Sequence, residues 1–285
     1  MRDVLLTALA PIIWGTTYFV TTQFLPPNRP LFVSTIRATP IGLLMLAGLR
    51  ELPKGISLLR TSVLGTLNIG LFFALLFTAA YRLPGGVVAT LMAIQPLLVA
   101  LLAWVILAEH PALRTFLAAA FGLLGVTLIV LGPTAPLDTV GVIAGLAATL
   151  VMASGTVLTK RWGRSAPLVV FTSWQLVAGG LILLPFALVV EGSPPTLTTR
   201  NLFGFAWLGM VGTGIAYTLW FRGLGKLKAS TVALLGLLSP VSAVLLDLLL
   251  LQKSFSRVQV GGAALVLGSI VISQLRSEER KTATT

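Results

Sequence analysis

The sequence lacks cysteine, contains a single histidine and has few charged residues. Without cysteine there can be no disulfide, thiolate nucleophile or thiolate metal site. The lone His110 excludes a histidine-rich metal centre or proton relay. Charged residues make up 10% of the 285 residues, against about 25% in soluble domains. A soluble enzyme is therefore excluded, because the chain has too little polar surface to stay dissolved.

Apolar residues dominate what remains, at 56% of the chain with a mean hydropathy of +0.98. Runs of at least about 18 apolar residues predict membrane-crossing helices. Ten such runs lie at 4–24, 32–49, 61–81, 86–108, 113–131, 140–160, 167–190, 202–222, 229–251 and 257–275. We therefore predict an all-α polytopic membrane protein with ten transmembrane helices.

The net charge of +12 is distributed unevenly between the two membrane faces. With a cytoplasmic N-terminus, fourteen lysines and arginines fall on the cytoplasmic side and five on the opposite side. The positive-inside rule then predicts that both termini are cytoplasmic. Attraction of these residues to anionic lipid headgroups accounts for the charge, so we expect no nucleic-acid partner.

Two parts of the sequence repeat each other at a constant offset of 144 residues. The segment from Gly85 to Pro96 matches the segment from Ala229 to Pro240, and weaker matches join 122–130 to 265–272 and 8–17 to 148–157. We predict two five-helix repeats, over 1–135 and 136–285. Because each repeat crosses the membrane an odd number of times, the second is inverted relative to the first. Inverted repeats around a central cavity are typical of secondary transporters.

Several residues in fixed order carry a resemblance to a known family. They are Trp14 with Gly15, Arg37, Pro96, Glu109, Gly122, Gly125 and Pro240. With the ten helices in two halves, this pattern resembles the EamA-type branch of the drug/metabolite transporter superfamily, which includes YddG-like bacterial amino-acid exporters. The resemblance implies export of small metabolites such as amino acids through a central cavity, by alternating access. It also implies that the protein lies in a bacterial inner membrane.

The two mid-helix prolines of the repeat indicate where a substrate binds. A proline inside a helix lacks an amide hydrogen and kinks the chain, which frees backbone carbonyls, here at Met92 and Gly236. Gln95 and Ser239 precede the prolines at the same depth. Interrupted helices at matching positions of two repeats predict a transporter site.

Three helices carry polar and aromatic stripes that line either a cavity or a helix contact. In the 4–24 helix the stripe includes Trp14, Thr17 and Tyr18, and in the 202–222 helix it includes Tyr217 and Trp220. A weaker stripe in the 140–160 helix contains Thr149, Met152, Thr156 and Thr159.

The predicted substrate-binding residues are Trp14, Thr17, Tyr18, Gln95, Pro96, Thr156, Tyr217, Trp220, Ser239 and Pro240. We predict no catalytic residue, metal site or cofactor.

Charged residues inside the predicted helices limit the mechanism. Arg37 is expected to face the protein or the outer headgroups, since exposure to lipid is costly. Asp247 is the one carboxylate inside a predicted helix, near its outer end, and pairing with Arg37 is possible. With no carboxylate at the depth of the prolines, we expect uncoupled transport of small neutral or zwitterionic solutes. A proton-coupled antiporter and a passive facilitator remain alternatives.

Other classes of membrane protein have little support in the sequence. An intramembrane serine enzyme would need Ser154 and His110 at one depth, and they lie at different depths. There is no phosphate-binding loop for ATP and no repeated filter as in a channel. The GxxxG pattern of Gly141 and Gly145 serves either packing within the chain or dimerisation, so the oligomeric state stays open.

Overall fold

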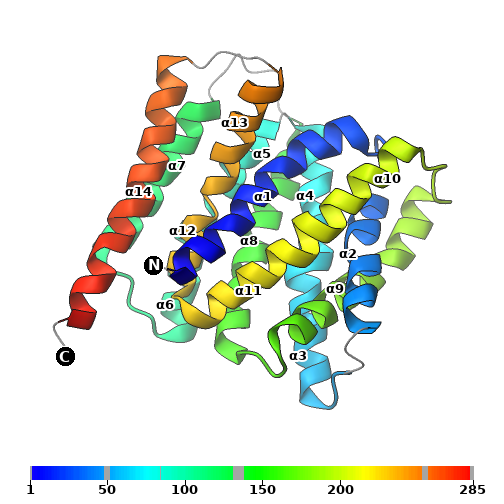
Figure 1. The fold of residues 1–285 in the computed structure, drawn as a ribbon, viewed down its shortest axis with the longest axis horizontal. Coiled ribbons are helices and arrows are strands. Elements are labelled where there is room, and N and C mark those ends of the chain that lie inside the picture. Colours follow the sequence, from blue (N-terminus) through cyan, green and yellow to red (C-terminus); the bar gives the residue numbers. More distant parts are fainter. Residues whose placement is uncertain (1, 48–51, 84, 131–137, 252–255, 283–285) are drawn as a thin grey trace.

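The computed structural model describes residues 2–47, 52–83, 85–130, 138–251 and 256–282, and within these ranges it consists of helices and short connectors, with no strand (Figure 1). The α-helices of the first half are α1 (Arg2–Phe24), α2 (Pro30–Ala47), α3 (Ile56–Gly65), α4 (Leu71–Arg82), α5 (Gly85–Met92), α6 (Gln95–Leu107) and α7 (Leu113–Val130). Those of the second half are α8 (Thr139–Trp162), α9 (Leu168–Phe186), α10 (Thr199–Ala206), α11 (Ala216–Lys226), α12 (Ala229–Leu235), α13 (Leu238–Leu251) and α14 (Arg257–Thr282). Three π-helical segments, η1 (Thr66–Gly70), η2 (Ala187–Glu191) and η3 (Trp207–Ile215), join or extend them.

Within the described residues, seven helical segments are long and apolar enough to cross a membrane. They are Arg2–Phe24, Pro30–Ala47, Ile56–Arg82, Val87–Leu107, Thr139–Trp162, Leu168–Glu191 and Thr199–Lys226. Shorter apolar helices cover Leu113–Leu128, Ala229–Ala243 and Arg257–Ile270. Each predicted run falls on one of these segments, and the chain is a polytopic membrane protein.

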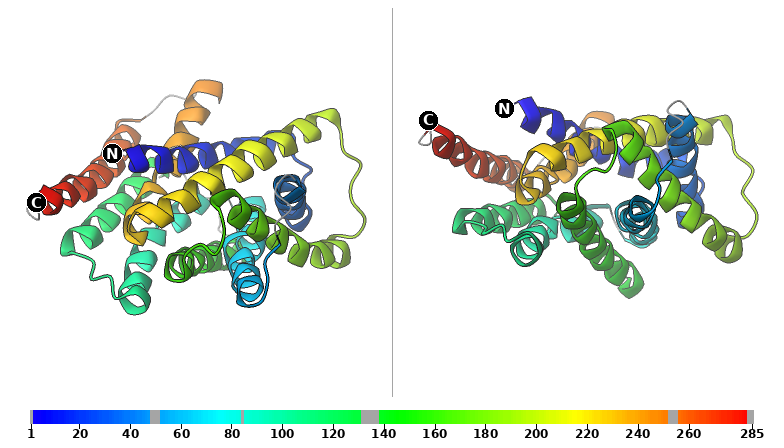
Figure 2. Two further views of the ribbon diagram at one scale, coloured as in Figure 1. Left: turned by 60° about the horizontal axis from the view of Figure 1, so that its bottom comes forward. Right: turned by 90° about the horizontal axis from the view of Figure 1, so that it is seen from below.

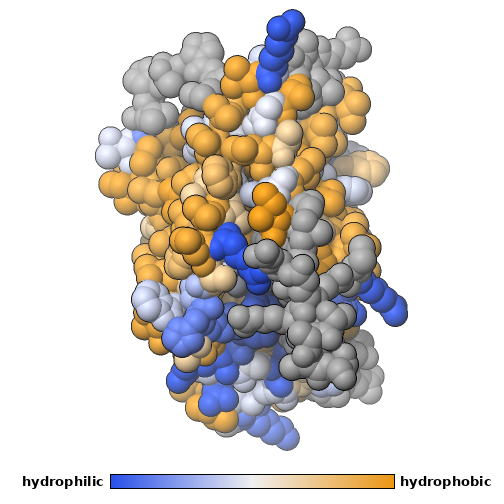
Figure 3. Space-filling view, turned by 90° about the vertical axis from the view of Figure 1, so that its left-hand side faces the viewer, coloured by the Kyte–Doolittle hydropathy of each residue, from blue (hydrophilic) through white to orange (hydrophobic). Residues whose placement is uncertain are grey.

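The outer surface is apolar over much of its height. Large hydrophobic side chains such as Val105, Val189, Phe203 and Leu249 are exposed. In Figure 3, apolar residues dominate the middle and upper parts of the face shown, whereas hydrophilic residues gather at its lower end. Such a belt is suited to lipid and not to water.

Two helical elements begin three or more residues earlier than the sequence predicts. The run predicted at 61–81 begins at Ile56, and the run predicted at 202–222 begins at Thr199. At the second of these, the side chains of Thr198 and Asn201 bond each other's backbone N–H groups in a capping box. A polar first turn can be helical when its free N–H groups are satisfied in this way.

The packing pairs each element of one half with the other half. At one side of the molecule α2 packs along α9, and at the opposite side α7 packs along α14 (Figure 1). Two further sets of contacts match each other, because α1 packs on α11 and α13 while α8 packs on α4 and α6. Figure 2 shows α1 and α11 side by side on one face of the molecule.

Glycines permit a close helix crossing between α9 and the junction of α3 with η1. A methyl group added to Gly179 would lie 2.6 Å from the carbonyl oxygen of Gly65 and 2.8 Å from the amide nitrogen of Gly70. In the other half, Gly209 and Gly214 face Ile41 of α2. The π-helical segments η1 and η3 therefore lie at close crossings with helices of the other half.

The GxxxG pattern at the start of α8 packs within the chain. A methyl group added to Gly141 would lie 2.7 Å from Leu83 Cγ, and one added to Gly145 would lie 2.7 Å from Leu91 Cδ1. Both contacts are with the α4–α5 region of the same chain. This surface is therefore occupied and is not free for dimerisation.

Carboxylates at one end of the molecule cap helices. The two carboxylate oxygens of Glu191 accept hydrogen bonds from the amides of Leu31 and Phe32, at 2.6 and 2.8 Å, in the first turn of α2. Asp138 accepts a hydrogen bond from the Gly141 amide at 2.7 Å and forms a 3.3 Å ion pair with Arg82. Negative charge at a helix N-terminus satisfies free amides and opposes the helix dipole.

Candidate substrate-binding cavity

A cavity lies between the two halves of the chain, at the depth where two helices are interrupted. Its lining residues are Trp14, Thr17, Tyr18, Arg37, Phe72, Phe73, Leu76, Ala89, Met92, Ala93, Gln95, Pro96, Met152, Tyr217, Trp220, Ala233, Gly236, Leu237, Ser239 and Pro240. Nine of the ten predicted site residues are among them, and Thr156 is not. Their role in binding stays a prediction.

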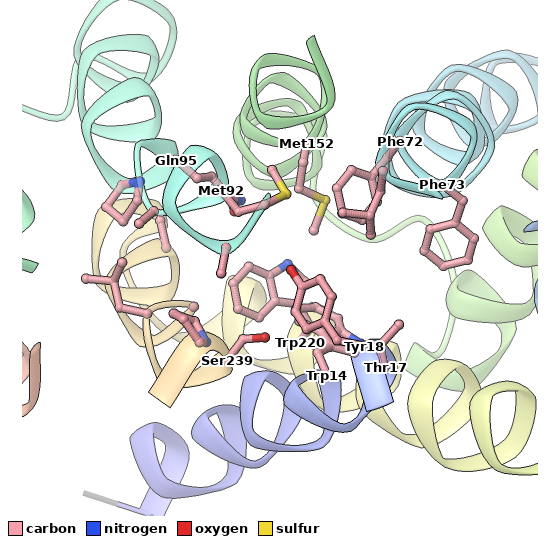
Figure 4. Close-up of a pocket in the computed structure, with 18 of the residues that line it drawn as sticks. Trp14, Thr17, Tyr18, Phe72, Phe73, Met92, Gln95, Met152, Trp220 and Ser239 are labelled. Carbon is pink, nitrogen blue, oxygen red and sulfur yellow. The ribbon is translucent and has the colours of Figure 1, made fainter. Parts of the chain in front are cut away.

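The cavity is small in this conformation, at about 80 Å³. That volume holds a few water molecules, whereas pockets for small molecules typically measure about 300–1,000 Å³. Figure 4 shows Met92, Met152 and Phe72 on one side of the space, facing Trp14, Tyr18 and Trp220 on the other. A metabolite can enter only if these two walls move apart.

The helix interruptions expected from the prolines are present. Helix α5 ends at Met92 and α6 begins at Gln95, and α12 ends at Leu235 and α13 begins at Leu238. The expectation of a free carbonyl at Gly236 is wrong, because the Ser239 amide donates to this oxygen at 3.0 Å. The chain satisfies this carbonyl with a tighter turn around the break.

The stripe along α8 is mostly a helix contact. Thr149 donates its hydroxyl hydrogen to the Gly145 carbonyl at 2.8 Å, and Thr159 accepts a hydrogen bond from the Asn68 amide group at 2.9 Å. Thr156 is buried, although outside the cavity, because α8 packs directly on α4, α6 and η1. Only the longer side chain of Met152 reaches the cavity from this stripe.

Aromatic rings form the largest continuous part of the cavity wall. The Trp14 ring lies 5.0 Å from that of Tyr217 and 5.1 Å from that of Trp220, centroid to centroid. Trp14 Nε1 donates to the Gly212 carbonyl at 2.9 Å, and the Tyr217 hydroxyl donates to the Asn68 carbonyl at 3.1 Å. These hydrogen bonds fix the ring orientations and leave flat apolar faces for a ligand.

Arg37 lies in the same wall, 2% exposed, so the expectation that it faces the protein is confirmed. Its Nε donates to Thr213 Oγ1 at 2.8 Å and its Nη2 to the Gly212 carbonyl at 3.0 Å. The guanidinium carbon lies 4.6 Å from the centre of the Phe73 ring. The side chain of Asp247, the predicted partner of Arg37, is not among those that the structure describes.

Sequence analysis did not include several cavity residues among the site residues: Arg37, Phe72, Phe73, Leu76, Met92 and Met152. A signal existed for Arg37, because an ionisable residue inside a membrane helix marks a functional site by default. A signal also existed for Met152, which belongs to the predicted stripe of α8, and for Met92, which lies beside a predicted interruption. None exists for Phe72, Phe73 or Leu76, since an apolar side chain gives the same sequence pattern whether it faces lipid, core or cavity.

The sequence matches a known family of membrane proteins. A model of the EamA-like transporter family matches residues 1–131 and, separately, residues 139–274. The chain belongs to this family. EamA-like transporters are membrane proteins of the drug/metabolite type, which agrees with the apolar belt and the internal cavity.

Individual relatives cover nearly the whole chain. Protein PecM of Dickeya dadantii is 46% identical over 267 residues, which are 93% of this chain and 90% of PecM. A protein of Salmonella typhimurium named "Probable amino-acid metabolite efflux pump" is 22% identical over 99% of this chain and 98% of its own length. A solved structure, titled only "Crystal structure of protein", superposes with a TM-score of 0.81 at 20% identity and covers 98% of both chains, which shows a shared fold.

Proposed function

We propose that this EamA-family protein is a secondary transporter that exports small neutral or zwitterionic metabolites, with amino acids as its substrates. The observation that carries the proposal is the cavity between the halves, which collects Gln95, Ser239 and the aromatic residues of α1 and α11 at the two helix interruptions. Interrupted helices at a repeat interface are where transporters bind substrate. The Salmonella relative's name supports amino acids as substrates.

We also propose ten transmembrane helices arranged as inverted repeats over 1–135 and 136–285. The matching contacts of α1 with α13 and of α8 with α6 support this arrangement. So does the separate match of the family model to each half. Alternating access then consists of one half rocking against the other around the central cavity.

Transport is expected to follow the substrate's own gradient. In liposomes containing the purified protein, labelled amino acid should enter faster when unlabelled amino acid is trapped inside, because exchange through one cavity produces counterflow. With equal substrate on both sides, an imposed pH gradient should produce no accumulation, in the original chain and in Asp247→Asn alike. Accumulation that disappears in Asp247→Asn would instead establish the alternative, a proton-coupled antiporter. No counterflow with any amino acid would contradict the proposed substrate class.

Both termini are expected to be cytoplasmic. A reporter fused after Thr285 should be active only in the cytoplasm, and one inserted beside Ser193 should be active only outside it, because basic residues concentrate on the side that we assign to the cytoplasm. Paired alkaline phosphatase and fluorescent protein fusions measure both positions. The reversed pattern would overturn the assignment of the bacterial inner-membrane orientation.

A further inference from the structure

Arg37 is a buried cation, and no carboxylate pairs with it among the side chains that the structure describes, which do not include that of Asp247. The two ion pairs found there, Arg82 with Asp138 and Arg222 with Asp3, lie at helix ends and involve partly exposed side chains. A buried charge without a counter-charge is strongly destabilising, and more so inside a membrane. An anionic ligand bound beside the Arg37 guanidinium would neutralise this charge and remove the cost.

The existing contacts satisfy Arg37 only in part. Its two hydrogen bonds, to Thr213 and Gly212, use fewer than half of the N–H groups of a guanidinium, and Nη1 bonds none of the described groups. The rings of Phe73 and Phe77 lie 4.6 and 5.8 Å from the guanidinium carbon and attract it through their faces, but they carry no net charge. The remaining N–H groups lie in a residue that lines the cavity.

Other buried donors of the cavity also have no partner. Among the described residues, the hydroxyl of Thr17, Nε2 of Gln95 and Nε1 of Trp220 are buried without a hydrogen bond, and all three residues line the cavity. No acidic residue is among the lining residues that the structure describes. Since an unsatisfied buried donor costs about 1–3 kcal/mol, this wall is complementary to a ligand rich in acceptor oxygens.

The guanidinium lies directly beside the aromatic wall. The Gly212 carbonyl accepts hydrogen bonds from both Arg37 Nη2, at 3.0 Å, and Trp14 Nε1, at 2.9 Å. The Trp14 ring in turn packs against Tyr217 and Trp220. An anionic group bound to Arg37 therefore places the rest of the ligand against flat apolar rings.

We infer that Arg37 binds the carboxylate of the transported substrate while the aromatic wall holds an aromatic or apolar body. This inference rests on the proposed transport function and narrows its substrate class to carboxylic acids with such a body. Aromatic amino acids belong to this class. Their amino group is not required for recognition, since none of the described cavity-lining residues carries a carboxylate that could bind it. Amines that lack a carboxylate are outside the inferred substrate class.

Four compounds that share a phenyl ring test this recognition: L-phenylalanine, 3-phenylpropanoate, 3-phenylpropanamide and phenethylamine. Isothermal titration calorimetry on the full-length purified protein measures their binding. The two carboxylates should bind at least about tenfold more tightly than the amide and the amine, because a hydrogen bond to a charged partner is the strong kind. Arg37→Met should remove the difference between acid and amide, and Arg37→Lys should keep the preference for the acid. Arg164→Met, in an exposed connector, is the matched control and should change nothing.

Equal affinity of the original chain for acid and amide would overturn the inference, and so would an acid preference that survives in Arg37→Met. A purely structural Arg37 would lower the melting temperature of Arg37→Met without changing its ratio of acid to amide affinity, which also overturns it. If Arg37→Met does not fold, the original chain and Arg37→Lys decide the question.

Counterflow in the same preparation separates the two proposals, because transport without carboxylate preference contradicts only the role of Arg37. Absence of amino-acid transport contradicts the proposed function, and the binding series still tests the site.

Discussion

Gly179→Ala should lower the stability of the folded protein by about 3 kcal/mol, near the upper end of the usual cost of an overpacked site. The added methyl group would lie 2.6 Å from the Gly65 carbonyl oxygen, 2.6 Å from Ile69 Cβ and 2.8 Å from the Gly70 amide nitrogen. Two of these atoms belong to the backbone, so they can move only if the whole crossing of α9 and η1 opens. Fluorescence-detected thermal unfolding in detergent measures the shift.

The matched controls are Gly261→Ala and Gly268→Ala in α14. An added methyl group meets no described atom within 4 Å at either position. Alanine is also the better helix former, so these variants should be as stable as the original chain or more stable. A Gly179→Ala protein that melts together with the two controls would show that the crossing is looser than the structure indicates.

Removing the rings of the cavity wall should weaken substrate binding. Trp14→Ala, Tyr217→Ala and Trp220→Ala each delete one face of the stacked cluster, and loss of a stacking or cation–π surface is worth about 0.5–2 kcal/mol, several-fold or more in affinity. Binding and counterflow of aromatic amino acids measure the effect. Because Trp14 packs against both other rings and shares its Gly212 acceptor with Arg37, its variant should show the largest loss.

Trp104→Ala is the control for the cavity tryptophans. Its side chain is 49% exposed on α6, away from the cavity lining, so its loss should leave affinity unchanged. Two results would contradict a cavity role for the three rings. One is an equal loss of affinity in Trp104→Ala, and the other is loss of thermal stability in the cavity variants without a change in relative affinities.

The helix positions and the two interruptions could be predicted from the sequence because each depends on local chemistry. A long apolar run marks a membrane helix wherever it occurs, and Pro96 and Pro240 interrupt a helix by their own geometry. The aromatic stripes of α1 and α11 were visible for the same reason, since Trp14 and Tyr18 are four residues apart and so lie on one helix face.

The π-helical segments and half of the cavity wall could not be predicted, because they depend on contacts between distant parts of the chain. Nothing near Gly65 or Gly70 indicates that Gly179 lies against them. Phe73 and Leu76 are apolar like the lipid-facing residues around them, and only the packing of α4 brings them to the cavity. Thr156 was assigned to the cavity because helical periodicity defines a face without showing what lies opposite.

The orientation of the cavity rings depends on the number of residues in the π-helical segments η1 and η3. A π-helical turn holds an extra residue, so everything after it is turned relative to an uninterrupted α-helix by about 100°, the rotation of one residue. Phe73 follows η1 and Tyr217 follows η3, and their rings lie 5.8 Å apart across the cavity wall. Deleting one residue from either segment would keep hydropathy and helix content and yet turn one of these rings out of the wall. Gaps in alignments at these two segments therefore identify relatives whose cavities are built from different helix faces, even where every aromatic residue is retained.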